Sequence, residues 1–234
     1  TDNGCYGFDI DSDLPELVHT VSEIPQKFFI RVGMMNPMYM PRIRDGLLKS
    51  FESTKVFKFL HIPVQSGSDK VLNDMKRGHT AQTFRDVTNH FRNKFEKFTI
   101  STDVIVGFPT ETVDDFEQTL QLLQETKPDI VNLSRYSRRP GTDAAEMKQI
   151  DVAEVKRRSK IAYELITKIS NKNNRKWIGW EGHVIFDEEY EGQIRGRNFA
   201  YKPIFVKEMP KIGQILNVRI TDATNHSLIG KIIS

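Results

Sequence analysis

Short apolar runs alternate with amphipathic stretches through the first three-quarters of this chain. Four apolar runs, at residues 28–32, 56–60, 98–106 and 130–133, predict buried β-strands. Apolar residues at helical spacing predict helices at 13–21, 43–51, 69–76, 80–91, 113–126 and 151–173. Strands that alternate with helices predict a parallel sheet with right-handed crossovers. The fold class is therefore α/β. Because about eight such units close a TIM-type barrel, four predict a partial (β/α) barrel or a small open sheet.

The pattern changes after residue 177. Five short apolar runs separated by Gly, Asn and Asp predict strands at 184–186, 193–197, 203–206, 215–220 and 228–233. This spacing is typical of a small five-stranded antiparallel β-barrel of the oligonucleotide-binding type. We therefore expect two domains, a partial barrel with a long basic helix at residues 1–174 and a β-barrel at 175–234.

Composition narrows the class of protein. The 234 residues are 28% charged with a mean hydropathy of −0.47, and no apolar run reaches the ~18 residues that a membrane span needs. No signal peptide opens the chain. The single cysteine, Cys5, excludes an internal disulfide and an all-cysteine metal site, and it suits a cytoplasmic protein. Residues 1–4 have the composition of a loop that follows a strand, so we expect a fragment that begins inside a domain.

Charge is uneven along the chain. The net charge is only +3, yet residues 148–176 contain nine basic residues and three acidic ones. This helix could follow RNA phosphates, or it could be an ordinary solvated face. The β-barrel mixes basic residues with aromatic ones, a combination that favours single-stranded nucleic acid. Acidic residues at 187–191 weaken that interpretation, and a purely structural barrel stays open.

Polar and glycine-rich segments follow three of the predicted strands. They lie at 61–69, 102–112 and 136–142. Because carboxyl ends of parallel strands meet at one edge of a sheet, these segments predict one shared ligand pocket. Gln65, Ser66 and Ser68 are candidates to line it, although Ser68 or Asp69 could simply cap a helix. Asp103 lies inside an apolar strand, where a carboxylate is costly unless it is paired or functional.

Arginines and an acidic residue add to this predicted edge. Arg31 follows an apolar run, and three arginines cluster at residues 135–139, where they could bind carboxylates or phosphates or be solvated. Glu111 could bind a ligand or favour the start of the next helix through the helix dipole.

In this order and spacing, residues 61–68, 75–77, 102–112 and 136–145 resemble the radical S-adenosylmethionine methylthiotransferases. The C-terminal barrel is similar to the RNA-binding TRAM domain of that family. Residues 1–7 and 31–37 resemble the archaeal and eukaryotic branch. That branch converts N6-threonylcarbamoyladenosine at position 37 of tRNA, next to the anticodon, to its 2-methylthio form.

The resemblance implies radical chemistry that depends on iron–sulfur clusters. Three cysteines hold a [4Fe–4S] cluster that cleaves S-adenosylmethionine, and a second cluster supplies sulfur. This chain contains no Cys-x3-Cys-x2-Cys motif, and Cys5 is not at a cluster-ligand position. We therefore expect neither catalytic residues nor metal ligands in this chain, and no activity from it alone. The alternatives are a non-catalytic RNA-binding module, or a methylthiotransferase acting on isopentenyladenosine in tRNA or on a ribosomal protein.

The resemblance also implies which residues of the chain bind cofactor and RNA. For S-adenosylmethionine these are Asn3, Arg31, Asn36, Gln65, Ser66, Ser68, Asp103, Ile105 and Gly107. For the anticodon stem-loop of tRNA they are Arg135, Arg139, Arg157, Arg158, Arg195, Arg197 and Lys202. A sulfur donor is the other expected partner of the intact enzyme.

Overall fold

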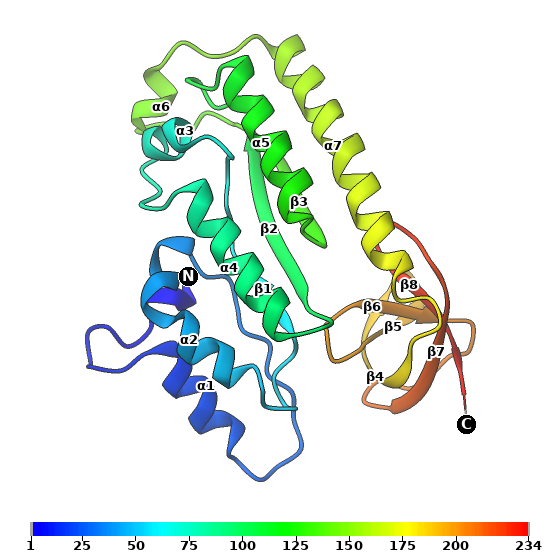
Figure 1. Ribbon diagram of the computed structural model, residues 1–234. Helices are drawn as coiled ribbons and strands as arrows, with labels where there is room; N and C mark the ends of the chain where they lie inside the picture. The colour runs from blue at the N-terminus through cyan, green and yellow to red at the C-terminus, as the bar shows by residue number, and fades with distance from the viewer. Residues whose placement is uncertain (1, 234) are drawn as a thin grey trace.

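A computed structural model describes residues 2–233. It contains a parallel sheet covered by helices and a separate β-barrel, and the long helix α7 (Val152–Arg175) leads from one to the other. Figure 1 shows the barrel at the lower end of α7, beyond the amino ends of the parallel strands. The predicted fold class, a partial (β/α) barrel followed by a small β-barrel, is confirmed.

The parallel sheet has three regular strands in the order β1-β2-β3. They are β1 (Phe59–His61), β2 (Thr99–Val106) and β3 (Ile130–Arg135). Leu60 aligns with Ile100, and Ser101 aligns with Ile130. Residues on β2 alternate between the helix-covered face and the opposite, open face, which carries Asp103 and Ile105.

The strand predicted at 28–32 is wrong as a regular element. That segment makes one isolated parallel bridge, between Ile30 and Val56, and Met34, just beyond it, makes another with His61. Within residues 2–233 it pairs along one side only, so a continuous ladder does not form, and Phe29 and Arg31 are exposed. The strand predicted at 56–60 starts only at Phe59. The backbone N–H of Lys58 does not pair within the sheet, because it donates to the carbonyl of Phe199 in the barrel, at 2.7 Å.

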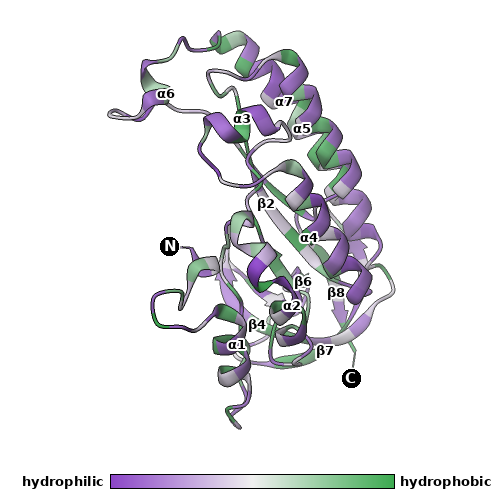
Figure 2. Ribbon diagram, turned by 60° about the vertical axis from the view of Figure 1, so that its left-hand side comes forward, coloured by the Kyte–Doolittle hydropathy of each residue, from purple (hydrophilic) through white to green (hydrophobic). Residues whose placement is uncertain are grey.

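Helices cover one face of the sheet, and several of them begin at polar caps. Asp13 caps α1 (Leu14–Ser22), Ser68 caps α3 (Asp69–Asp74), and Thr112 caps α5 (Val113–Thr126). The remaining elements are η1 (Asn3–Cys5), η2 (Pro37–Tyr39), α2 (Met40–Ser50), α4 (Ala81–Lys94) and α6 (Asp143–Glu146). Figure 2 shows green and purple residues side by side along α4, α5 and α7, as expected for helices with one buried face.

Five strands close the C-terminal barrel in the order β4-β5-β6-β8-β7. They are β4 (Glu181–Tyr190), β5 (Gln193–Arg197), β6 (Pro203–Val206), β7 (Ile215–Ala223) and β8 (Leu228–Ile232). Phe186, Ile204 and Val218 are among the residues that fill its core. The expectation of a wholly antiparallel barrel is wrong at one place, because β6 pairs with β8 in parallel. An odd number of strands cannot alternate in direction all the way round a closed ring, so one parallel pair is required.

The junction between the two domains is packed. Helix α7 ends at Arg175, and Trp177 belongs to the barrel core.

Within residues 2–233, none of the helices is both long and apolar enough to cross a membrane.

Candidate S-adenosylmethionine and RNA site

A cavity of about 580 Å³ opens at the carboxyl ends of the parallel strands. Its walls come from β2, from β3 and the loop that follows it, and from the segments on either side of α3. Five of the predicted site residues line it: Gln65, Asp103, Ile105, Arg135 and Arg139. The three polar segments therefore contribute to one pocket, as the sequence predicts.

Asp103 is the polar centre of the open face. Its Oδ1 accepts a hydrogen bond from Asn132 Nδ2 at 2.7 Å and lies 3.0 Å from His61 Nε2. Burial alone would raise the pKa of Asp103, but these hydrogen bonds hold that pKa below its ordinary value. Asp103 is therefore a carboxylate at neutral pH, and it is oriented by its two neighbours.

Gln65 lines the cavity and has a strained backbone conformation. Its φ is +70°, a conformation that costs a non-glycine residue energy and persists only where surrounding structure holds it. Here the Gln65 N–H donates to the Asp103 carbonyl at 2.8 Å, and the Gln65 carbonyl accepts from the Ile105 N–H at 2.9 Å. Pairing with β2 thus fixes Gln65 beside Asp103.

Two cavity residues that sequence analysis did not select carry unsatisfied polar atoms. Arg77 Nε and Tyr136 Oη are buried and have no hydrogen-bond partner within residues 2–233. Burial lowers the pKa of Arg77, which the nearby charge of Asp103 opposes and that of Arg139 reinforces. A half-buried guanidinium with a free N–H is suited to an anionic ligand. In the sequence, Arg77 belongs to the family-like segment 75–77 and immediately precedes Gly78, but neither feature assigns it a ligand.

Ser66, Ser68 and Gly107 do not reach the cavity through their side chains. The Ser66 hydroxyl lies 3.3 Å from that of Thr119, and Ser68 donates to Asp115 Oδ1 at 2.7 Å. Both serines are almost fully buried, so their hydroxyls hold α3 and α5 together, and Ser68 caps α3. Gly107, with φ of +80°, has no room for a side chain because Val155 would lie 2.7 Å from a Cβ.

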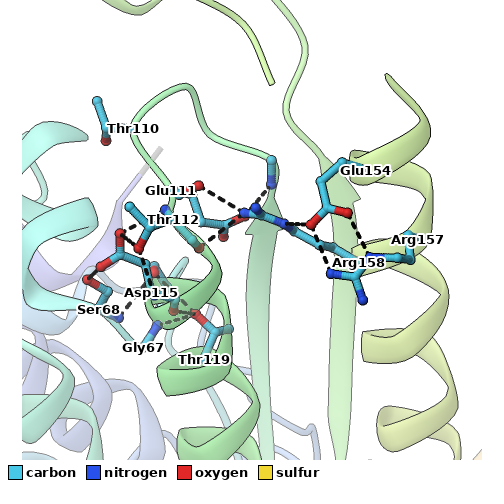
Figure 3. Close-up of polar contacts among 12 residues, drawn as sticks. Gly67, Ser68, Thr110, Glu111, Thr112, Asp115, Thr119, Glu154, Arg157 and Arg158 are labelled. Atoms are coloured by element: carbon cyan, nitrogen blue, oxygen red, sulfur yellow. Dashed lines mark hydrogen bonds and ion pairs between the residues drawn. The ribbon is translucent and has the colours of Figure 1, made fainter. Parts of the chain in front are cut away.

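Glu111 has a structural role, as part of a buried ion-pair network beside Gly107. Its carboxylate is fully buried, accepts from the Gly107 N–H at 2.9 Å and pairs with Arg158 Nη1 at 2.8 Å. Arg158 also donates to Glu154 at 2.8 Å (Figure 3). Arg158 is only 4% exposed, so the expectation that it contacts RNA does not match its position.

The other predicted cofactor residues lie away from the cavity. The Asn3 amide donates to the Met34 carbonyl at 3.3 Å, and the Asn36 side chain caps η2. Arg31 lies at the amino end of β1, with its guanidinium carbon 4.8 Å from the ring centre of Phe59. Arg31 is therefore at the opposite end of β1 from the cavity, although its segment runs parallel to β1 and Met34 is bridged to His61.

The predicted RNA-binding residues of the barrel fall into two groups. Arg195 and Arg197 are partly exposed and pair with Glu188. Lys202 is only 2% exposed, and its ammonium lies 2.9 Å from Asp129 Oδ1 and donates to Asn174 Oδ1 at 3.0 Å. Lys202 therefore joins the domains and is not free to reach phosphates. Arg157 is exposed beside Glu154.

Comparison with known families agrees with this geometry. A family model described as the radical SAM superfamily matches residues 7–123, which is half of the chain and includes β1, β2 and most of α5. The chain belongs to the radical SAM superfamily. A TRAM domain model matches residues 184–233, the greater part of the closed barrel.

Relatives of this radical SAM chain match it from end to end. It is 42% identical to a protein of Archaeoglobus fulgidus named "Probable threonylcarbamoyladenosine tRNA methylthiotransferase", over 99% of the chain and 54% of the relative. A Methanocaldococcus jannaschii protein of the same name is 42% identical over 99% of the chain and 53% of the relative. The Drosophila melanogaster "Threonylcarbamoyladenosine tRNA methylthiotransferase" is 37% identical over 99% of the chain and 42% of the relative. The chain thus spans about half the length of the curated relatives it matches.

A solved structure shares the fold of this radical SAM chain. Coproporphyrinogen III oxidase from Escherichia coli superposes with a TM-score of 0.51 and 16% sequence identity, covering 86% of this chain and 50% of that one. At this identity the likeness supports the fold alone.

The cavity fits part of S-adenosylmethionine, whereas the chain does not fit an iron–sulfur cluster. Ile105 and Phe108 form an apolar surface in the cavity, beside the carboxylate of Asp103 and the Nε–H of Arg77 that has no acceptor within residues 2–233. Such a cluster needs several thiolates, and the sequence has one cysteine. Cys5 is exposed, and residues 2–233 contain no group of three metal-ligating side chains.

Proposed function

We propose that this chain is the S-adenosylmethionine- and tRNA-binding part of a methylthiotransferase that acts on N6-threonylcarbamoyladenosine in tRNA. The observation that carries the proposal is the collinear match, at 37–42% identity over 99% of the chain, to archaeal and insect proteins with that name. The TRAM match in the closed barrel supports a tRNA substrate. A tRNA partner is also consistent with the cytoplasmic location that composition predicts.

The cavity supports a specific division of roles for S-adenosylmethionine. Arg77 would pair with the methionine carboxylate, since its buried Nε lacks an acceptor. Asp103 would accept hydrogen bonds from the ribose hydroxyls, the Gln65 amide could accept from or donate to them, and Ile105 with Phe108 would cover the adenine. These residues of the chain would hold S-adenosylmethionine in place, and the cofactor would supply the radical chemistry of the intact enzyme.

The finer parts of the proposal concern the partners. The anticodon stem-loop would carry the modified adenosine to the cavity mouth, where Arg135 and Arg139 offer exposed cations to a substrate carboxylate. The sulfur donor and the cluster cysteines would have to come from outside this sequence, which has only Cys5. We therefore expect binding, and no methylthiolation, from the chain by itself.

Calorimetric titration of the chain with two ligands tests the cofactor assignment. Arg77→Gln should weaken S-adenosylmethionine binding by about 10-fold or more, because a hydrogen bond to a charged group contributes about 1.5–3 kcal/mol. The same variant should leave 5′-methylthioadenosine binding unchanged, since that ligand lacks the carboxylate. Arg85→Gln is the matched control, because Arg85 pairs with Glu125 on the helix-covered side. Equal losses for both ligands, or no binding by the unaltered chain, would contradict the assignment.

A second candidate function is a non-catalytic RNA-binding module, favoured by the single cysteine. It predicts RNA binding without any binding of S-adenosylmethionine. Mass spectrometry of tRNA nucleosides from a strain lacking the encoding gene separates the two. Loss of the 2-methylthio form of threonylcarbamoyladenosine supports the enzyme, and an unchanged nucleoside profile supports the module.

A further inference from the structure

The loop between β5 and β6 joins the barrel to the sheet. The Phe199 carbonyl accepts the Lys58 N–H at 2.7 Å, and the buried Lys202 ammonium holds Asp129 from the sheet side. Within the loop, the side-chain oxygen of Asn198 accepts from the N–H groups of Ala200 and Lys202 at 3.0 and 3.1 Å. The loop conformation is therefore fixed by buried polar contacts from both domains.

Tyr201, in this loop, has an unusual backbone conformation. Its φ is +58°, in the left-handed region that bulky residues rarely occupy. Such strain persists only where the surroundings hold it, and it concentrates at functional positions. The ring lies against two rings of the sheet domain, with centroid distances of 5.0 Å to Phe57 and 5.2 Å to Phe59.

One arginine from each domain lies against the Tyr201 ring. The guanidinium carbon of Arg31 is 5.3 Å from the ring centre of Tyr201, and that of Arg197 is 4.5 Å away. Arg31 is exposed and makes no ion pair or side-chain hydrogen bond within residues 2–233. Arg197 reaches Glu188 at 3.3 Å and lies 3.9 Å from Asp187, yet its buried Nε has no acceptor. Both cations thus keep unused donors.

These residues lie on the same side of the sheet as the cavity. Phe59 is two residues before His61 on β1, so the two side chains point to one face. His61 contacts Asp103, which lines the cavity. An extended ligand on the open face could therefore touch both the Arg31 side chain and the cavity.

We propose that Arg31 and Arg197, held against Tyr201, form a platform for unpaired RNA next to the nucleotide that enters the cavity. A guanidinium fixed against rings offers a flat outer surface for a base and N–H edges for phosphates, at little cost in side-chain entropy. That combination favours RNA over an acidic protein or a lipid headgroup, neither of which offers stacked bases. The inference rests on the proposed function for the choice of tRNA as the source of the RNA. Tyr201 acts as a positioning residue.

Fluorescence anisotropy with a labelled anticodon stem-loop RNA tests the platform on the intact chain. Arg31→Gln should weaken binding about 5- to 50-fold and lower the slope of log affinity against log salt by about 0.7, the effect of one phosphate contact to a single strand. Arg31→Lys should restore the salt slope, because it keeps the charge, but only part of the affinity, because the planar group is lost. Arg44→Gln, on α2 beside Asp45, is the matched surface control.

Each outcome bears on the proposal. Full recovery of affinity by Arg31→Lys would overturn the stacking role, and unchanged affinity of Arg31→Gln would overturn the platform as a whole. A lower melting temperature of Arg31→Gln with unaltered RNA affinity would make the contact purely structural. If the unaltered chain binds S-adenosylmethionine but no RNA, the platform and the tRNA part of the proposed function both fail. If the unaltered chain binds both S-adenosylmethionine and RNA, and Arg31→Gln leaves the RNA affinity unchanged, only the platform fails.

Discussion

Replacement of Arg158 by leucine should destabilise the sheet domain through an unpaired carboxylate. The Arg158 and Glu111 side chains are 5% and 0% exposed, and their Nη1 and Oε2 atoms lie 2.8 Å apart. Arg158 Nη1 also donates to the carbonyls of Glu111 and Thr112 at 2.9 and 3.2 Å. Loss of one partner from a buried ion pair costs about 3–5 kcal/mol, because the other charge stays buried without compensation.

The pH dependence gives this prediction a signature. Burial raises the pKa of Glu111 even with Arg158 in place. A carboxyl whose folded-state pKa is raised costs stability above that pKa, and the cost disappears as the pH falls through it towards the unfolded value. Without Arg158 the folded pKa of Glu111 rises further. The loss of unfolding free energy in Arg158→Leu should therefore be largest near pH 7 and smaller near pH 5.

Urea denaturation followed by ellipticity at 222 nm is the assay, because every described α-helix ends at or before Arg175 and the signal therefore reports the sheet domain. Arg157→Leu is the control, since Arg157 is an exposed partner of Glu154 and should cost less than about 1 kcal/mol. Glu111→Gln added to Arg158→Leu should recover part of the stability. A loss below about 1 kcal/mol for Arg158→Leu, or one that is the same at both pH values, would refute the reasoning.

Two other perturbations test the domain junction and the packing of the polar segment 61–69. Lys202→Met removes the nearer cation from buried Asp129 and leaves Arg92 Nη2, 3.7 Å from the other carboxylate oxygen. The variant should therefore cost about 3 kcal/mol in urea denaturation and expose the junction to limited proteolysis. Unchanged proteolysis would show that the Lys202–Asp129 ion pair does not hold the domains together. Gly67→Ala would place a Cβ 2.4 Å from the Gln118 carbonyl oxygen and 2.5 Å from Thr119 Cα, so it should lower the melting temperature by forcing α5 away, at about 1–3 kcal/mol. An unaltered melting temperature would show that this backbone contact can relax freely.

Local patterns predicted several elements well. The helix predicted at 113–126 has those bounds, because Thr112 and Asp115 form a capping box at its start and the apolar residues repeat along one face. The strands at 193–197 and 203–206 also match. The predicted strand at 28–32 failed because a strand needs partners, and partners depend on the arrangement of other segments.

The candidate site was predicted only in part for a similar reason. Gln65 and Asp103 line the cavity because the carboxyl ends of parallel strands converge, a rule that can be applied to sequence. Arg77 was not selected as a site residue although it lies in the family-like segment 75–77, since its burial and its place in the cavity wall depend on segments distant in the sequence. The basic residues at 158 and 202 were assigned to RNA, yet both are buried in ion pairs with acids distant in the sequence.

By itself, the sequence determined the α/β and β-barrel classes, the starts of the well-capped helices and the polar segments that follow the strands. These follow from side-chain periodicity and from residue types at element ends, which are local properties, whereas the radical SAM assignment came from the resemblance of whole segments to a known family. Only the tertiary structure decided which charges are free. A buried arginine, a paired lysine and an exposed arginine stacked on rings have the same local signature, because burial and pairing depend on segments brought together from 47 to 170 residues away.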